Sequence, residues 1–430
     1  MTSIFTGSGY VPRIVDQQLA QLFAGLAAVA IEGPKGVGKT RTAAQLASVT
    51  FELDNPAVRQ VLQADPSRLT TAAGPVLIDE WQRWPDSWDL VRRAVDENSA
   101  PGRFLLAGSA SPRTPPTHSG AARIVDVRMR PATLAERGFV PSVSLAALLA
   151  GGRPPVVGST TVSLGDYVEQ ITASGLPAVT GRTEAARRAL LDAYIARIVD
   201  RDFPDAGLQV RNPATLRRWL AAYAAATATT ASFETVRAAA TPGESAKPAR
   251  STTQPYKDTL ERIWISDPVP GWSPTRSHIN RLTNAPKHHL ADPALAVAIL
   301  GLDADHLLSG QAGGPPISRA GTFLGALLES LVALNLRVYA QAAGATVGHL
   351  RTKSGDREVD FIVQARAGKV VALEVKLSAT VDSDDVRHLV WLADQLGDDL
   401  LDAAVLTTGS DAYRRPSDGI AVIPVALLGP

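Results

Sequence analysis

The segment Gly33-Pro-Lys-Gly-Val-Gly-Lys39-Thr40 limits how this chain can fold more than any other feature, because it fits G-x-x-x-x-G-K-[ST] at every fixed position. A short apolar run, residues 28–32, precedes it, and residues 41–49 follow with apolar side chains at helical spacing. A strand, a glycine-rich loop and a helix in this order direct backbone N–H groups and the helix dipole at phosphate oxygens. The residues expected to bind the nucleotide are Gly33, Pro34, Lys35, Gly36, Val37, Gly38, Lys39, Thr40 and Arg41.

Two side chains of this segment have specific expected roles. Lys39 would contact the β- and γ-phosphates as a catalytic cation, and the Thr40 hydroxyl would bind Mg²⁺. The chain has only eight lysines in 430 residues, yet Lys35 and Lys39 both fall in this loop. That concentration argues against a chance match and predicts a nucleotide and Mg²⁺ as cofactors.

Two further apolar runs end in polar residues. Residues 75–78 lead into Asp79 and Glu80, as expected for a buried parallel strand. Asp79 would hold Mg²⁺ and Glu80 would orient or activate the attacking water. Taken alone, Asp-Glu after an apolar run is equally an ordinary strand end, but the upstream loop favours the catalytic interpretation. Residues 104–108 end at Ser109, either a γ-phosphate sensor or part of a Gly-Ser turn.

Arg123 follows the third run in a Gly-Ala-Ala-Arg-Ile context. It has two interpretations of equal weight. One is an arginine finger that contacts the nucleotide within the chain or on a neighbour. The other is an ordinary surface arginine, since arginine is abundant here.

A chain of 430 residues predicts two or three domains. Residues 1–150 alternate strands and helices, residues 156–310 have mostly helical periodicity, and residues 316–430 return to an α/β pattern. Gly/Pro-rich stretches separate the three blocks. The expected class is α/β: a P-loop parallel sheet, a helical or winged-helix middle domain, and a C-terminal α/β domain.

The last block reads as a helix over 321–339, strands over 346–351, 358–364 and 369–377, a helix over 384–396 and a strand over 403–407. This order resembles the PD-(D/E)xK nuclease core, a restriction-endonuclease-like fold. The residues that would fill its site are Asp360, Glu374 and Lys376 as catalytic groups, with Glu329, Asp360 and Glu374 as metal ligands. The alternative is a solvated Glu/Lys pair at a strand end, against which the apolar run before Glu374 counts.

The middle block is less informative. Helical stretches over 231–240 and 251–264, separated by Pro242-Gly243, would form a helix-turn-helix with Lys257 and Arg262 facing a phosphate backbone. A helical connector with solvated charges is favoured, because no dense basic cluster is present. The adjacent His288 and His289 have no evident third ligand, so a metal site there is not expected.

The motifs also resemble a known family, on segments spread over nearly the whole chain: Arg13, Gly33–Thr40, Leu77-Ile-Asp-Glu-Trp-Gln-Arg-Trp-Pro85, Leu105-Leu-Ala-Gly-Ser109, Arg123, Pro131–Glu136, Arg201-Asp202 and Lys287-His-His-Leu-Ala-Asp-Pro-Ala-Leu295. They are similar to the AAA-type ATPases of bacteria and archaea that carry a DUF4143 C-terminal region. The resemblance implies ATP as the nucleotide, a winged-helix or helical middle and a nuclease-like end. Trp81 and Ala122 depart from it, where the family usually has a small apolar residue and glycine.

Composition narrows the partners. Lys+Arg (43) nearly balances Asp+Glu (42), and no cysteine is present, which excludes disulfides and thiolate sites. No signal peptide or membrane span is predicted, so a cytoplasmic protein is expected. The first hypothesis is an ATPase that controls a nuclease-like domain directed at DNA or RNA. The alternative is an ATP-dependent switch or binding module that recognises nucleic acid or a protein partner without cutting; a homo-oligomer is left open.

Overall fold

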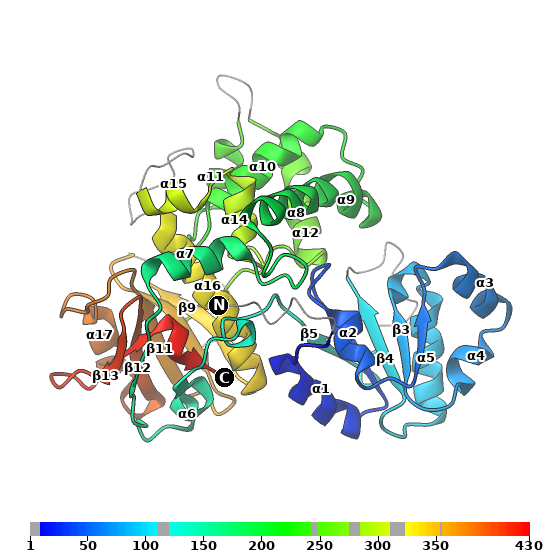
Figure 1. Cartoon of the computed structure of the whole chain (residues 1–430), viewed down its shortest axis with the longest axis horizontal. Coiled ribbons are helices and arrows are strands. Elements are labelled where there is room, and N and C mark those ends of the chain that lie inside the picture. The colour runs from blue at the N-terminus through cyan, green and yellow to red at the C-terminus, as the bar shows by residue number, and fades with distance from the viewer. Residues whose placement is uncertain (1–8, 110–119, 242–246, 275–283, 310–322, 353–354) are drawn as a thin grey trace.

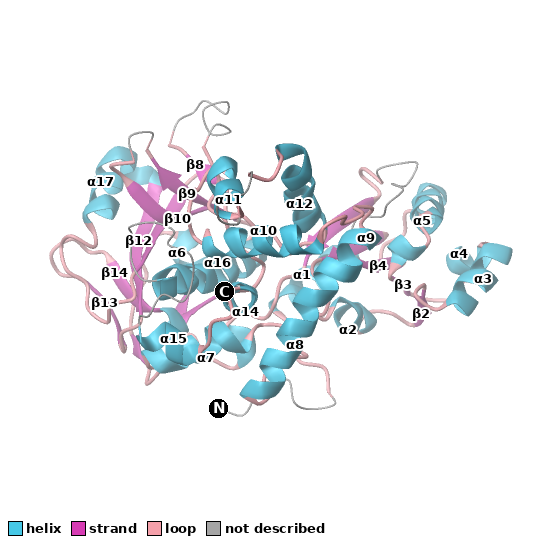
Figure 2. Cartoon of the chain, turned by 90° about the horizontal axis from the view of Figure 1, so that it is seen from above, coloured by secondary structure: helices cyan, strands magenta, loops and turns pink. Residues whose placement is uncertain are grey.

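The protein is described here by a computed structural model covering residues 9–109, 120–241, 247–274, 284–309, 323–352 and 355–430. Two sheets lie toward opposite ends of the long axis, and most of the remaining helices lie between or above them (Figures 1 and 2).

The N-terminal domain is a five-stranded parallel sheet in the order β2-β3-β4-β1-β5. Its elements are α1 (Ile14–Gly25), β1 (Ala28–Glu32), α2 (Lys39–Ala44), β2 (Val49–Glu52), α3 (Pro56–Ala64), α4 (Ser67–Thr71), β3 (Val76–Asp79), α5 (Asp86–Glu97), β4 (Phe104–Gly108) and β5 (Ile124–Arg128). One face of the sheet packs against α1 and α2, and the other against α3, α4 and α5. This is the P-loop-type α/β sheet that the strand–loop–helix pattern predicts.

Helix α2 is shorter than the predicted helix over residues 41–49. It ends at Ala44, and a turn leads directly into β2 at Val49. The apolar spacing that indicated a longer helix comes instead from side chains such as Leu46, which packs on the core from the turn. Periodicity alone does not separate a helix from a turn followed by a half-buried strand.

The middle of the chain is helical. Its elements are α7 (Leu164–Ala173), α8 (Glu184–Arg197), the π-helix η4 (Ile198–Asp202), α9 (Phe203–Asp205), α10 (Pro213–Ala225), α11 (Phe233–Ala239), α12 (Arg250–Arg262), α14 (Pro293–Ile299) and α15 (Ala304–Ser309). Within the described part of residues 160–308, the only strand is β8 (Gly271–Trp272), and it belongs to the C-terminal sheet. The helical alternative therefore fits this region, whereas a winged helix would need a β-hairpin of its own.

The C-terminal domain is a mixed eight-stranded sheet in the order β7-β13-β14-β12-β11-β10-β9-β8. Its strands are β7 (Gly158–Ser159), β9 (Thr346–Arg351), β10 (Glu358–Gln364), β11 (Val370–Val375), β12 (Leu400–Thr407), β13 (Asp411–Arg414) and β14 (Ala421–Pro424). Strands β9, β10 and β11 are antiparallel, and β12 runs parallel to β11. Helix α16 (Phe323–Ala342) covers one face and α17 (Arg387–Leu396) the other.

The boundary between the first two blocks differs from the one expected at residue 150. Strand β6 (Val143–Ser144) pairs with β15 (Leu428–Gly429), helix α6 (Leu145–Ala150) packs near β11 and β12, and β7 extends the C-terminal sheet beside β13. The segment 143–159 therefore belongs structurally to the C-terminal domain. A domain boundary placed at a Gly/Pro-rich stretch misses this association, because the strands that pair with β6 and β7 lie far away in the sequence.

Among the described residues, α16 is the one helix with the length and apolarity to cross a membrane. Of its most apolar window, 72% is buried inside the protein, against the C-terminal sheet, α1 and α7. This is the environment of a core helix, so the composition of α16 is explained by packing.

A buried ionic cluster joins the three regions. Asp267, in the middle block, accepts from Arg130 Nε at 2.7 Å and from Arg337 of α16 at 3.0 Å, with Arg128 of β5 at 3.5 Å. Burial would raise the pKa of the Asp267 carboxyl, but the three guanidinium groups hold it well below its ordinary value. Asp267 is therefore a charged contact shared by all three parts of the chain.

Candidate functional site: the phosphate loop and a buried lysine–carboxylate cluster

The loop between β1 and α2 has a backbone that requires glycine. Gly38 has φ of 104°, and Gly33 has φ of 154°. A Cβ atom on Gly33 would lie 2.0 Å from the Met129 carbonyl oxygen. Only glycine combines these angles with such a close approach, so the fixed glycines of the motif are explained by the geometry of the loop.

The functional side chains of the loop point to one place. Lys39 Nζ donates to the carbonyl oxygens of Gly33 (2.9 Å) and Pro34 (2.8 Å), and Thr40 Oγ1 donates to Asp79 Oδ1 at 2.9 Å. Burial lowers the pKa of Lys39 to about 8 and raises that of Asp79 to about 6, the latter opposed by the hydrogen bond from Thr40. A hydroxyl beside a carboxylate is the oxygen donor set that Mg²⁺ takes together with nucleotide phosphates, so these residues fit the expected ion.

Glu80 and Ser109 meet beside this loop. Strands β3 and β4 are neighbours, so both residues lie just past the carboxyl edge of the sheet. Glu80 Oε1 accepts from Ser109 Oγ at 3.2 Å, and Oε2 accepts from Gln82 Nε2 at 2.6 Å. Glu80 has φ of 52°, a strained conformation for a residue with a side chain, of the kind found at functional sites. The carboxylate is thus held in a fixed orientation.

A pocket of about 250 Å³ adjoins the phosphate loop. The N-terminal segment, the loop and the middle domain all contribute to it. Its lining consists of Gly9, Tyr10, Val11, Arg13, Val37, Gly38, Arg41, Thr42, Met129, Pro177 and Ala178. Mostly apolar walls with a few polar groups suit a flat aromatic base. Arg41, predicted to bind the nucleotide, lies in this wall.

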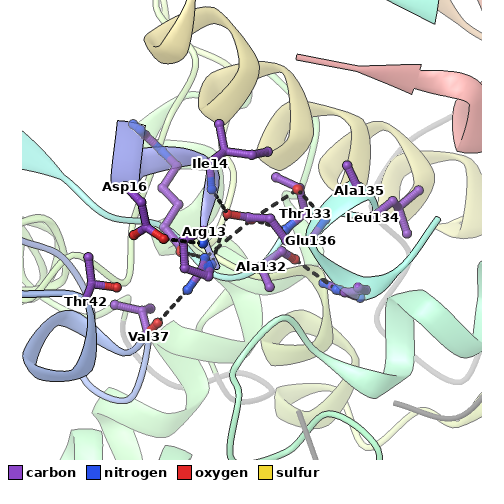
Figure 3. A network of polar contacts seen from close by, with 12 residues as sticks. Arg13, Ile14, Asp16, Val37, Thr42, Ala132, Thr133, Leu134, Ala135 and Glu136 are labelled. Atoms are coloured by element: carbon purple, nitrogen blue, oxygen red, sulfur yellow. Dashed lines mark hydrogen bonds and ion pairs between the residues drawn. The ribbon is translucent and has the colours of Figure 1, made fainter. Parts of the chain in front are cut away.

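Arg13 ties the loop to the segment that follows β5 (Figure 3). Its guanidinium donates to the carbonyl oxygens of Val37 and Arg130, each at 2.8 Å, and pairs with Glu136 at 2.9 Å. Glu136 also accepts from the Ile14 backbone N–H at 2.8 Å. The family resemblance included Arg13 and Glu136, but no spacing in the sequence connects residues 123 positions apart.

The middle domain also contacts the phosphate loop. Lys35 Nζ forms an ion pair with Asp202 Oδ1 at 2.5 Å, and the Tyr194 hydroxyl donates to the Lys35 carbonyl oxygen at 3.0 Å. Asp202 ends the π-helix η4, a form often found at functional positions. A more exposed pair, Arg83 with Asp205 at 3.3 Å, lies on the same side. Lys35 is therefore engaged by the middle domain in this structure.

Arg123 is not brought to the phosphate loop. It precedes β5 at the amino edge of the sheet, since Ile124 pairs with Ala28, whereas the loop follows the carboxyl edge. Its guanidinium pairs with Asp96 at 2.8 Å, and both side chains are exposed. A finger acting within the chain is therefore contradicted, while one acting on a neighbour stays a prediction. The preceding residue, Ala122, has φ of 63°, an angle that glycine adopts without strain. This explains why the family that the chain resembles usually has glycine at this position.

A second cluster forms in the C-terminal domain. Glu329 on α16, Asp360 on β10 and Glu374 on β11 come together as predicted, and Glu358 joins them. Lys287 of the middle block lies in their midst: its Nζ is 2.9 Å from an oxygen of Glu329, of Glu358 and of Asp360. The Lys287 side chain is only 2% exposed. Lys287 lies in a segment that carries the family resemblance, but no pattern in the sequence predicts a role for it.

Charges inside this cluster are balanced by protonation. Burial raises the pKa of Glu329 to about 8, although Lys287 opposes the rise, and burial together with Asp360 raises the pKa of Glu374 well above its ordinary value. For Asp360, burial is outweighed by Lys287 and by hydrogen bonds, which lower its pKa. For Lys287, burial is outweighed by the carboxylates, which raise its pKa. Near neutral pH, one ammonium thus faces fewer ionised carboxylates than the four side chains suggest.

Lys376 lies beside this cluster rather than inside it, and its charge opposes the rise in the pKa of Glu374. Its Nζ lies 3.6 Å from Asp385 Oδ1, and the side chain is about one-third exposed. A divalent ion shared by Glu329, Asp360 and Glu374 does not fit either, because the Lys287 ammonium already bridges Glu329 and Asp360. Within the described ranges, no group of three or more His, Asp or Glu side chains is arranged to hold a metal ion.

The two helices of the proposed helix-turn-helix correspond to α11 and α12, but Pro242-Gly243 falls outside the described residues. Lys257 pairs with Glu261 on the same helix at 2.9 Å, and Arg262 donates to Thr259. These charges are satisfied within α12, as expected for a connector. The ring of His288 bonds the Ala231 carbonyl oxygen at 2.7 Å.

Three family models match successive parts of the chain. Residues 27–137 match an AAA domain (AAA_14), residues 164–306 match a domain of unknown function (DUF8612), and residues 324–428 match another (DUF4143). These matches support an AAA-type ATPase domain combined with a DUF4143 domain, in agreement with the resemblance. The AAA match ends at residue 137, before the segment that packs on the C-terminal sheet.

Two curated relatives carry no assigned function. They are the uncharacterized proteins Mb2031c of Mycobacterium bovis and Rv2008c of Mycobacterium tuberculosis, each 27% identical over 361 residues, covering 82% of this chain and 70% of the relative. Among solved structures, two single-residue variants of Thermotoga maritima RuvB cover 60% of this chain and 89% of their own. Their TM-scores are 0.27 and 0.25, with 18% and 17% identity.

Proposed function

We propose that this chain is a Mg²⁺-dependent ATPase. In this proposal, Lys39 and the loop glycines hold the phosphates, Thr40 and Asp79 hold Mg²⁺, and Glu80 orients the attacking water. The observation that carries it is the meeting of Thr40 with Asp79 at 2.9 Å beside a Glu80 fixed by Ser109. Bound Mg²⁺ would offset charge on the phosphates, and the protein supplies orientation.

The test is ATP hydrolysis with Mg²⁺ by wild type, Glu80→Gln and a control, Glu97→Gln, at an exposed glutamate of α5. We expect Glu80→Gln to bind ATP but lose hydrolysis by about 100-fold or more, as for removal of a general base. Lys39→Ala should lose ATP binding, and the control should match wild type. Equal hydrolysis by Glu80→Gln and wild type would refute the assignment.

We further propose that the nucleotide cycle drives a switch in the other two domains. Support comes from two connections of the phosphate loop: Lys35 contacts Asp202 directly, and Val37 is linked through Arg13 and Arg130 to Asp267. The arrangement of β9 to β12 supports a restriction-endonuclease-like C-terminal fold. Because Lys287 fills its carboxylate cluster, we favour a domain that binds DNA, RNA or a protein partner over one that cuts.

Cleavage separates the two possibilities. We expect no cleavage of plasmid or single-stranded DNA by wild type, with Mg²⁺ and with or without ATP, in a preparation that hydrolyses ATP. Cleavage that disappears in Asp360→Asn would instead establish the nuclease hypothesis. Asp398→Asn, at an exposed position outside the cluster, is the matched control.

A further inference from the structure

We propose that the Lys287 ammonium is the built-in cation of the C-terminal carboxylate cluster and takes the place of a divalent metal ion. The inference concerns the C-terminal domain alone and does not depend on ATP hydrolysis. It assigns Lys287 as the residue that decides whether this cluster is open to metal.

The contact geometry is that of an ammonium site. Nζ has three N–H donors: it donates to Glu329 and Asp360 and forms an ion pair with Glu358, and each of the three N···O distances is 2.9 Å. Such distances are normal for charged hydrogen bonds, whereas Mg²⁺ needs oxygens at about 2.0–2.1 Å and Ca²⁺ at about 2.3–2.6 Å. The oxygens around this point are therefore spaced for nitrogen.

Asp360 leaves little capacity for a metal. Its Oδ1 accepts from Lys287, and its Oδ2 accepts from the Val375 backbone N–H at 2.9 Å. Glu374, from the neighbouring strand, is hydrogen-bonded to Asp360 as well. A metal ion would have to displace the ammonium and compete with these bonds.

Lys287 is also held firmly by its own backbone. Its N–H and C=O both pair with Val269, at 2.9 and 3.0 Å. The next residue, His288, exchanges backbone hydrogen bonds with Thr229 and Ala228 of the middle domain, at 2.9 and 2.7 Å. The Lys287 ammonium therefore comes from a segment outside the C-terminal sheet, and that segment is hydrogen-bonded to the middle domain.

An ion could nevertheless reach the cluster. The Glu358 side chain is 34% exposed, so one carboxylate faces solvent. Removing the ammonium would leave several carboxylates around an uncompensated space, which attracts a cation. Ca²⁺ binds oxygens at longer distances than Mg²⁺ does, so the carboxylate oxygens would have to move inward less to bind Ca²⁺. Ca²⁺ is therefore the first probe, and Mg²⁺ is the second.

The experiment is calorimetric titration of the nucleotide-free full chain with Ca²⁺ and then Mg²⁺. The samples are wild type, Asp360→Asn, Lys287→Met, the double variant, and Lys369→Met, at an exposed position away from the cluster, as the matched lysine control. We expect wild type, Asp360→Asn and Lys369→Met to bind ions alike. Lys287→Met should gain one bound Ca²⁺ per chain, and the double variant should lose it.

Two results would overturn the proposal. One is an ion bound by wild type and lost in Asp360→Asn, because the cluster would then hold metal beside Lys287. The other is a Lys287→Met protein with wild-type circular dichroism that gains no ion. If Lys287→Met does not fold, the comparison of wild type with Asp360→Asn decides by itself. Neither result depends on ATPase activity, so failure here is distinct from failure of the proposed function.

Discussion

Replacing Asp267 by asparagine tests whether the buried ionic cluster holds the three regions together. The amide keeps the shape of the side chain and removes its charge. Arg128, Arg130 and Arg337 would then remain buried around a neutral group, all three with side chains less than 20% exposed. Breaking a buried ion pair at one partner costs about 3–5 kcal/mol, because the other charge is left uncompensated.

The structure places the expected cost near the lower end of that range. Arg337 keeps a hydrogen bond to the Pro268 carbonyl oxygen at 2.6 Å, and Arg128 lies 4.0 Å from the centre of the Trp264 ring. We therefore expect a loss of about 3 kcal/mol. With an unfolding entropy of about 2.1 cal/mol/K per residue over 430 residues, this lowers the Tm by about 3 °C if the chain unfolds as one unit.

The matched control is Asp205→Asn. Asp205 also belongs to the middle block and also pairs with an arginine of the ATPase domain, but both side chains are more than 40% exposed. Exposed pairs contribute about 0.2–1 kcal/mol, so its Tm should fall by about 1 °C or less. Calorimetric melting of both variants beside wild type measures the difference. Equal losses would refute the claim that burial makes Asp267 structurally important.

Three further outcomes follow. Gly33→Ala should abolish ATP binding in a nucleotide-binding titration, because its Cβ would lie 2.0 Å from the Met129 carbonyl oxygen. Burial and then Lys287 lower the pKa of His289 to about 3 from its ordinary 6.5. As the pH is lowered, His289 therefore takes up a proton in the unfolded chain before it does so in the folded protein. Below about pH 6.5 the free energy of unfolding should decrease by up to about 1.4 kcal/mol per pH unit because of this residue. His289→Leu should remove that share of the pH dependence, measured by denaturation curves between pH 6 and 4. Arg123→Ala should leave hydrolysis by dilute protein unchanged, and a loss there would contradict its position.

The phosphate site was predictable because its residues are contiguous or end neighbouring strands. The glycines, Lys39 and Thr40 lie in one loop, and Asp79 and Ser109 follow apolar runs that become adjacent strands β3 and β4. Parallel strands expose their carboxyl ends at one edge, so pattern alone brings such residues together. Asp360 and Glu374 were predictable for a related reason, since β10 and β11 are adjacent and strand side chains alternate in direction.

The residues that sequence reasoning missed act through long-range contacts. Lys287 reaches Asp360 across 73 positions, and Arg13 reaches Glu136 across 123. No periodic pattern in the sequence indicates either contact, because each depends on how segments far apart in the sequence pack together. E-x-K spacing sets the face of the strand on which Lys376 lies, but it gives no sign of Asp385, from the segment leading to α17, whose carboxylate lies 3.6 Å from the Lys376 ammonium. The available signal for Lys287 was its place in the segment Lys287-His-His-Leu-Ala-Asp-Pro-Ala-Leu295, which the family resemblance includes.

Two extended segments of the middle block, joined by isolated antiparallel β-bridges, connect the two buried charge clusters. Val269 pairs with Lys287 in both directions, and the Asp267 N–H donates to the His289 carbonyl oxygen at 2.9 Å. This pairing therefore inserts one carboxylate among the arginines at the end of the ATPase sheet and Arg337 of α16, and one ammonium among the carboxylates of the C-terminal domain. Each inserted charge offsets repulsion between like charges that would otherwise be buried together. A nucleotide-driven movement that shifted these segments would weaken both clusters at once, so the proposed switch must either carry the three domains together or release Asp267 and Lys287 in a single step.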